Sequence, residues 1–73
     1  MPTAQTQLDA QYNEMRWRIL SLAADFDRIE RYAGGTELLR VDPKLADLRR
    51  CVRELLSDLP GRAERVQQLL SDR

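Results

Sequence analysis

Residues 8–33 read LDAQYNEMRWRILSLAADFDRIERYA, and apolar side chains recur in this stretch at alternating spacings of four and three without an intervening Gly or Pro. An α-helix brings residues three and four apart to the same side, so these side chains form one stripe. A mean spacing of 3.5 residues keeps such a stripe aligned with a partner helix, as in coiled coils and helical bundles. We call this stripe the seam; its members are Leu8, Tyr12, Met15, Ile19, Leu22, Phe26, Ile29 and Ala33.

A second apolar line lies on the far side of the same helix. It consists of Trp17, Leu20 and Ala24, and we call it the Trp17 line. Exposing an indole and a leucine together in water is unfavourable, which favours a second contact surface over a lone surface tryptophan lying among arginine side chains. One neighbouring helix cannot cover both faces. The predicted interaction surface therefore takes residues from both: Trp17, Leu20, Ala24, Leu22 and Phe26.

Local signals place the ends of this first helix near residues 6 and 33. Thr6 is a suitable N-cap, and the exposed sides carry opposite charges three or four residues apart, such as Glu14 with Arg18. Gly34 and Gly35 follow the last seam residue and tolerate the backbone conformation that ends a helix. A phosphate-binding glycine loop is strongly disfavoured, because no strand precedes the glycines and no lysine follows them at the required spacing.

The remaining chain predicts a loop over residues 34–42 and two further helices. Asp42 and Pro43 are a strong N-cap and a favourable first helical residue, so a second helix is expected over residues 43–58. Pro60 and Gly61 interrupt it, and a short third helix is expected over residues 61–71. The apolar set of the second helix is Leu45, Leu48, Val52, Leu55 and Leu59, widened on either side by Cys51 and Leu56.

These elements predict an all-α fold of one small domain, residues 1–73. The segments 6–33 and 43–71 have similar lengths and are expected to form an antiparallel helical hairpin whose second arm bends sharply at Pro60. A chain of this size buries a marginal core by itself. We therefore expect two chains to pair into a helical bundle, as a homodimer with the first helices central and Trp17 at or beside the intermolecular contact.

Composition argues against several kinds of chemistry. The chain contains no histidine, the most frequent general base and metal ligand, and its one cysteine, Cys51, lies beside apolar seam-like positions. No catalytic residue, cofactor site or metal site is therefore expected. The sequence has no signal peptide and no apolar run of membrane-spanning length, so a soluble, cytoplasmic protein without membrane contact is expected.

The function predicted from these observations is a non-enzymatic protein–protein interaction or self-assembly module that forms a homodimer and binds a protein partner. The alternative is a small nucleic-acid-associated regulator that uses the arginine-rich second half of the chain. Twelve basic residues balanced by twelve acidic ones argue against that alternative. The arginines concerned are Arg49, Arg50, Arg53, Arg62 and Arg65.

Overall fold

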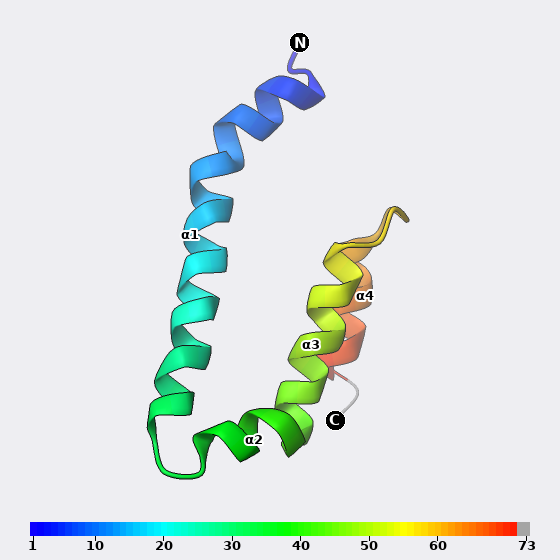
Figure 1. Ribbon diagram of the computed structural model, residues 1–73. Helices are drawn as coiled ribbons and strands as arrows, with labels where there is room; N and C mark the ends of the chain where they lie inside the picture. Colours follow the sequence, from blue (N-terminus) through cyan, green and yellow to red (C-terminus); the bar gives the residue numbers. More distant parts are fainter. Residues whose placement is uncertain (72–73) are drawn as a thin grey trace. The chain divides into compact units, whose positions relative to one another are not determined.

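The computed structural model describes residues 1–71, and every regular element in that range is an α-helix (Figure 1). The helices are α1 (Ala4–Arg31), α2 (Gly35–Val41), α3 (Pro43–Leu55) and α4 (Arg62–Ser71). The all-α prediction is confirmed. The chain divides into two compact units, Met1–Gly35 and Thr36–Arg73, each of which is described by itself below.

Helix α1 is one uninterrupted helix of 28 residues, which corresponds to a length of about 42 Å. It begins one turn earlier than the prediction of Thr6 as its cap. Thr3 is the N-cap: its hydroxyl accepts a hydrogen bond from the Thr6 amide at 3.1 Å, and the Thr6 hydroxyl accepts one from the Thr3 amide at 2.8 Å. This reciprocal pair satisfies the amides of both Thr3 and Thr6, which a single capping side chain at Thr6 would not do.

Helix α1 also ends earlier than predicted, at Arg31 instead of Ala33. Tyr32 is the C-cap, with an extended backbone and its amide donating to the Ile29 carbonyl at 3.2 Å. A turn then runs to Gly35, whose amide donates to the Tyr32 carbonyl at 2.9 Å, with Gly34 at φ +79°. The glycines do mark the end of the helix, but the turn that they make needs Tyr32 and Ala33 as well. Ala33 therefore lies outside the helical part of the seam.

The expected loop over residues 34–42 is mostly helix α2. The prediction of a loop was wrong. The two glycines interrupt the chain only at the turn before α2, and residues 36–41 contain no glycine or proline that would prevent a helix. Asp42 separates α2 from α3. It precedes Pro43, which disfavours helical geometry at the residue before it, and its ψ of 130° is extended. Asp42 caps α3 as predicted, accepting the Lys44 amide on its carboxylate at 2.8 Å.

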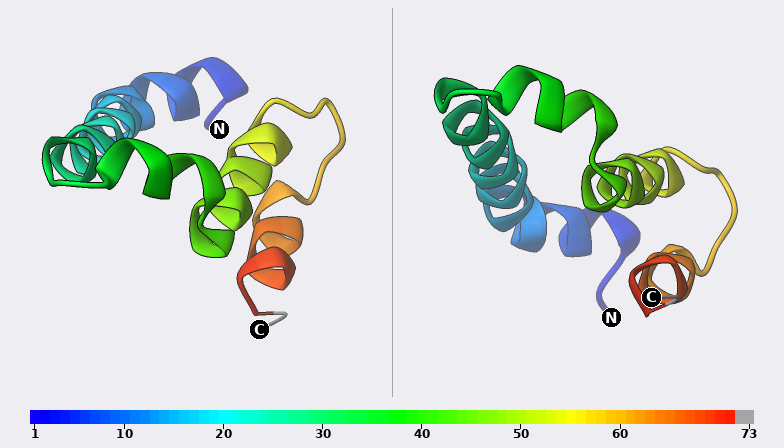
Figure 2. Two further views of the ribbon diagram at one scale, coloured as in Figure 1. Left: turned by 60° about the horizontal axis from the view of Figure 1, so that its bottom comes forward. Right: turned by 90° about the horizontal axis from the view of Figure 1, so that it is seen from below.

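Helices α3 and α4 pack side by side in opposite directions, as the three views in Figures 1 and 2 show. The predicted break at Pro60 is confirmed, and α4 folds back along α3. Helices α3 and α4 thus form an antiparallel pair within the second unit. Helix α3 ends at Leu55 and α4 begins at Arg62, so the predicted bounds of 43–58 and 61–71 are each too long at that junction.

The buried side of α3 includes Cys51 and leaves Val52 exposed. Leu45 is 6% exposed and Cys51 is 8% exposed, whereas Val52 is 39% exposed. The sequence placed Cys51 at the margin of the stripe because a cysteine weighs less than a valine or leucine in an apolar pattern. The side of α4 that is half-buried has the same spacing of three and four residues: Arg65, Val66 and Leu69.

Candidate interaction surface

The seam on α1 is largely open to solvent in the single chain. Ile19 is 68% exposed, and Leu8, Tyr12 and Met15 are each about half exposed or somewhat less. Leu22 and Phe26 are half-buried, as is Ile29. No residue of α1 is buried. In one chain Ile19 is therefore open to solvent, and Leu22 and Phe26 are only partly covered.

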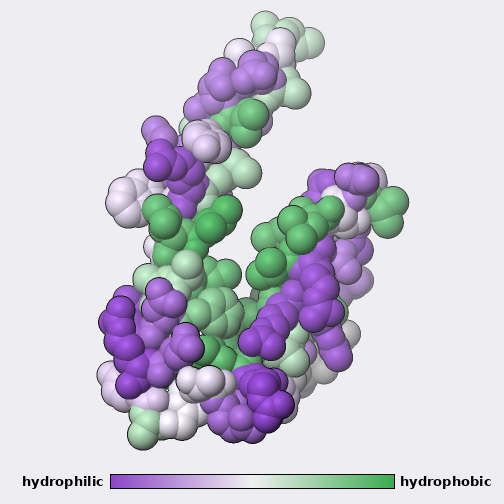
Figure 3. Space-filling model, viewed as in Figure 1, coloured by the Kyte–Doolittle hydropathy of each residue, from purple (hydrophilic) through white to green (hydrophobic). Residues whose placement is uncertain are grey.

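This exposure is unusual for such a regular pattern. A stripe of large apolar side chains along a helix of some 42 Å is typical of a surface that another helix covers. Figure 3 shows apolar side chains at the surface of α1, interleaved with polar ones. One open hollow on this helix is lined by Leu8, Asp9, Tyr12 and Asn13, between two consecutive positions of the seam. A gap of this kind between ridges is where a side chain from a facing helix packs.

The Trp17 line is exposed as well. Trp17 is 69% exposed and Leu20 is 53% exposed, whereas Ala24 is half-buried. Successive helical residues are rotated by about 100°, so Trp17 points away from Ile19 and Leu22. The five residues of the predicted interaction surface therefore lie on two opposite faces of α1. The structure brings Leu22 and Phe26 together on one face, and it places the Trp17 line on the other.

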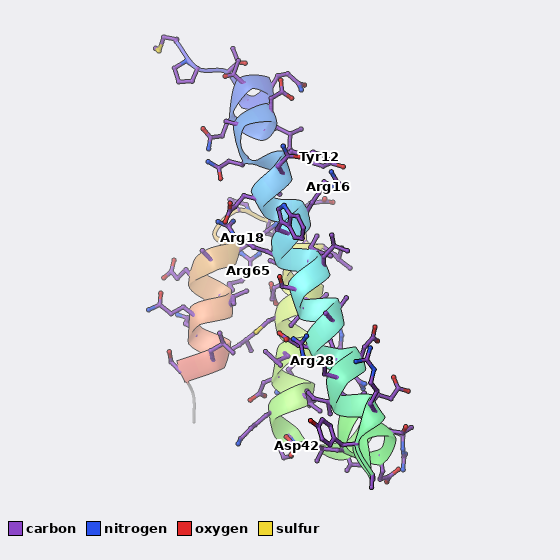
Figure 4. All side chains as sticks on the ribbon, turned by 90° about the vertical axis from the view of Figure 1, so that its left-hand side faces the viewer. Tyr12, Arg16, Arg18, Arg28, Asp42 and Arg65 are labelled. Atoms are coloured by element: carbon purple, nitrogen blue, oxygen red, sulfur yellow. The ribbon has the colours of Figure 1, made fainter. Side chains whose placement is uncertain are left out.

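Charged side chains flank the apolar faces of α1. Arg18 pairs with Glu14 at 3.6 Å, and Arg28 pairs with Asp25, as the sequence spacing predicted. Arg16 lies over the ring of Tyr12, with its guanidinium carbon 5.9 Å from the ring centroid (Figure 4). All these pairs are well exposed, so each contributes only a few tenths of a kcal/mol to the helix. They leave the flanking charges free to exchange partners when a second surface approaches.

The α3–α4 hairpin uses several of its arginines internally. The Arg65 guanidinium donates to the Glu54 carboxylate at 2.7 Å and to the carbonyls of Leu59 and Pro60. Arg62 donates through Nε to the Ser57 carbonyl at 2.7 Å. These bonds stabilise the turn between α3 and α4. The nucleic-acid alternative predicted from the sequence included Arg62 and Arg65, and nothing in the sequence pattern indicated that they stabilise the turn.

The remaining arginines of that group, Arg49, Arg50 and Arg53, are exposed on α3. Arg50 lies 3.9 Å from the Asp47 carboxylate, and Glu54 lies between Arg53 and the turn in the sequence. A nucleic-acid interface requires several arginine or lysine side chains available to phosphates on one face. Arg62 and Arg65 are already engaged with carbonyl and carboxylate oxygens of this chain. Two of the five arginines are therefore engaged within the α3–α4 hairpin.

Cys51 and the acidic residues add no second candidate. Cys51 is a free and buried thiol, as its apolar neighbours in the sequence predicted. Within residues 1–71, no three Cys, Asp or Glu side chains come together in a way that would hold a metal ion. Each helix in this range is either too short or too polar to span a lipid bilayer. The exposed faces of α1 thus carry the candidate surface, and Leu56 and Leu59 in the α3–α4 turn are exposed apolar side chains as well.

Comparisons with known proteins add no relative to these observations: no family model matches the sequence, and neither the curated proteins nor the solved structures include a significant match.

Proposed function

We propose that this protein is a non-enzymatic self-assembly and protein-interaction module that forms a homodimer through α1. The observation that carries the proposal is the exposure of an uninterrupted heptad seam, with Ile19 at its middle 68% exposed. Leaving several large apolar side chains in water forgoes about 1.5–3 kcal/mol for each one that a partner would bury. A second helix with the same pattern offers the matching surface.

The Trp17 line is the second part of the proposal. A helix that covers the seam leaves Trp17 and Leu20 on the opposite side of α1, because the two faces lie about half a turn apart. We assign this line to a further contact on the face of α1 opposite the dimer interface, made either within the assembled dimer or with another protein. Aromatic side chains at such positions contribute disproportionately to association.

Sedimentation equilibrium at micromolar concentration tests the proposal. We expect about twice the mass of the 8.5 kDa chain. Ile19→Glu places a charge in the middle of the seam and should give a monomer, and Trp17→Glu should weaken association to a smaller degree. Gln67→Glu is the matched control: it adds a negative charge to an exposed side chain of α4, outside both apolar faces of α1, and the dimer should persist. A monomeric wild-type protein with the fluorescence emission maximum of a fully hydrated tryptophan would overturn the proposal.

A further inference from the structure

We infer that the two α1 helices of the homodimer run antiparallel, with Ile19 of one copy facing Leu22 of the other. This inference rests on the proposed function and names the partner surface: a second copy of the same seam. It is drawn from the charges that flank the seam, because the apolar pattern by itself fits parallel and antiparallel pairing alike. Each arrangement brings different flanking charges together across the interface.

In the antiparallel arrangement, apolar residues fill successive layers. Ile19 faces Leu22 of the second copy, Met15 faces Phe26, and Tyr12 faces Ile29. Two-fold symmetry repeats each pair, so six of the seam residues inside α1 find an apolar partner. Large and medium side chains alternate across these layers. Beyond the outermost of these layers, Leu8 faces Ala33 of the second copy, which is the residue after the C-cap of α1.

The flanking charges complement one another in this alignment. The residues that precede Ile19 and Phe26 in the sequence are Arg18 and Asp25, and both are exposed. Antiparallel pairing places Arg18 opposite Asp25 of the second copy, and symmetry provides the same pair twice. One like-charge contact remains at each end, where Asp9 faces Glu30, but both residues lie in the terminal turns of the interface, where solvent screens them.

Parallel pairing is disfavoured by the same residues. An in-phase parallel dimer would place Asp25 beside Glu30 of the second copy at two symmetric sites. It would also stack Phe26 on Phe26 and Tyr12 on Tyr12, which concentrates large rings in two layers. Arg18 would then face Ala23 and would gain no acidic partner. The parallel arrangement therefore has two repulsive contacts and lacks the attractive pair.

Antiparallel alignments shifted by one heptad are also less favourable. A shift in one direction brings Arg18 against Arg18 and Arg16 against Arg16 of the second copy. A shift in the other direction pairs Arg16 with Glu30 but sets Asp25 against Asp25. That shift also moves Leu8 and Tyr12 beyond the end of the facing helix. The charges thus favour one of the three antiparallel alignments, as they favour it over the parallel one.

Distance measurements between spin labels test the inference directly. Gln7 and Ser21 are exposed residues at the same heptad position, two heptads apart, and neither belongs to the seam. Each is replaced by cysteine in a Cys51→Ala background and labelled with a nitroxide. In the proposed dimer Ser21 lies near the two-fold axis, so its two labels are separated only by the width of the helix pair. The two Gln7 labels lie at opposite ends, with an axial separation of about 40 Å.

Each outcome of this experiment has one meaning. Short distances at both positions would show a parallel dimer and overturn the inference while leaving the proposed function intact. A short Ser21 distance with a Gln7 distance about 10 Å longer or shorter than expected would show a shift of one heptad and overturn the alignment. Absence of dipolar coupling at both positions, in samples that sediment as monomers, would overturn the proposed function as well.

A charge exchange provides a second test that keeps Cys51 in place. Arg18→Asp puts two acidic residues opposite each other at both symmetric sites and should weaken the dimer several-fold. Adding Asp25→Arg restores opposite charges across the interface and should recover most of the lost affinity. A loss followed by recovery is expected only for the proposed alignment. In a parallel dimer Arg18 faces Ala23, so Arg18→Asp alone would cause no such loss, whereas Asp25→Arg would strengthen the dimer through Glu30. A double variant as weak as Arg18→Asp, with unchanged helix content, would overturn the inference.

Discussion

Two adjacent glycines connect α1 to α2 for two different reasons. Gly34 has a positive φ of 79°, which residues with a side chain rarely adopt, but a Cβ there would meet no atom within 4 Å. Gly35 has ordinary backbone angles, but a Cβ there would lie 2.0 Å from the Ile29 carbonyl oxygen. At Gly34 the backbone conformation disfavours any other residue, and at Gly35 the lack of space for a Cβ does so.

This difference predicts unequal effects of the same substitution. Gly34→Ala should lower the free energy of unfolding by about 1–2 kcal/mol through backbone strain alone. Gly35→Ala should cost more, because the backbone of the turn must move to admit the methyl group. Thermal unfolding followed by circular dichroism measures both. Equal losses for the two variants would contradict this description of the turn.

Arg65 is the residue that joins α4 to the end of α3. It bonds one carboxylate on α3 and two carbonyls of the turn, and its side chain is about one-quarter exposed. Arg65→Ala should lower the free energy of unfolding by about 1–2 kcal/mol, a value reduced for partial exposure of the pair. Arg65→Lys keeps the charge but loses the planar guanidinium, so its free energy of unfolding should lie between those of the wild type and Arg65→Ala. Urea unfolding of both variants checks the order, and a neutral Arg65→Ala would contradict it.

At the scale of elements, Pro60 stands in a turn and does not kink a continuous helix. Helix α3 has already ended at Leu55, the Leu56 and Ser57 amides donate to carbonyls of the last turn of α3, and Gly61 has a φ of 81° before α4 begins. Removing the proline therefore cannot extend α3 by itself. The bonds from Arg62 and Arg65 and the φ of Gly61 still hold the turn.

Pro60→Ala should consequently change the free energy of unfolding by less than about 1 kcal/mol, and helix content should stay the same. Gly61→Ala is the comparison, because it forces a residue with a side chain into the left-handed region and should cost about 1–2 kcal/mol. Circular dichroism and melting temperature measure both. A clear gain in helicity for Pro60→Ala would mean that the break depends on the proline alone.

At the scale of the whole molecule, the seam of α1 couples stability to association. Leu22 is half-buried in one chain and would be fully covered in the proposed dimer. Leu22→Ala should then lower the free energy of unfolding by about 2–5 kcal/mol, and the melting temperature should rise with protein concentration. Ala23→Ser, at the next residue, is a mild exposed control. An unchanged melting temperature for Leu22→Ala would show that the seam is not a packing surface.

Much of this protein could be predicted from its sequence, because the signals involved are local. The alternating spacing from Leu8 to Ile29, the Asp42–Pro43 start and the Pro60–Gly61 break act over at most a few turns of helix. Periodicity and capping depend on neighbours in the sequence, so they indicated the all-α class, the start of α3 and the break before α4. The two opposite apolar faces of α1 follow from the same periodicity.

Only the tertiary structure decided which helices pair and which apolar residues are covered. Burial depends on what lies opposite a side chain, and Ile19 and Leu45 look alike in the sequence although one is 68% exposed and the other 6%. With α4 folded back along α3, Cys51 is buried, and Arg65 bonds to Glu54. A contact between residues eleven positions apart leaves no periodic signal, because it arises from the path of the turn between the helices.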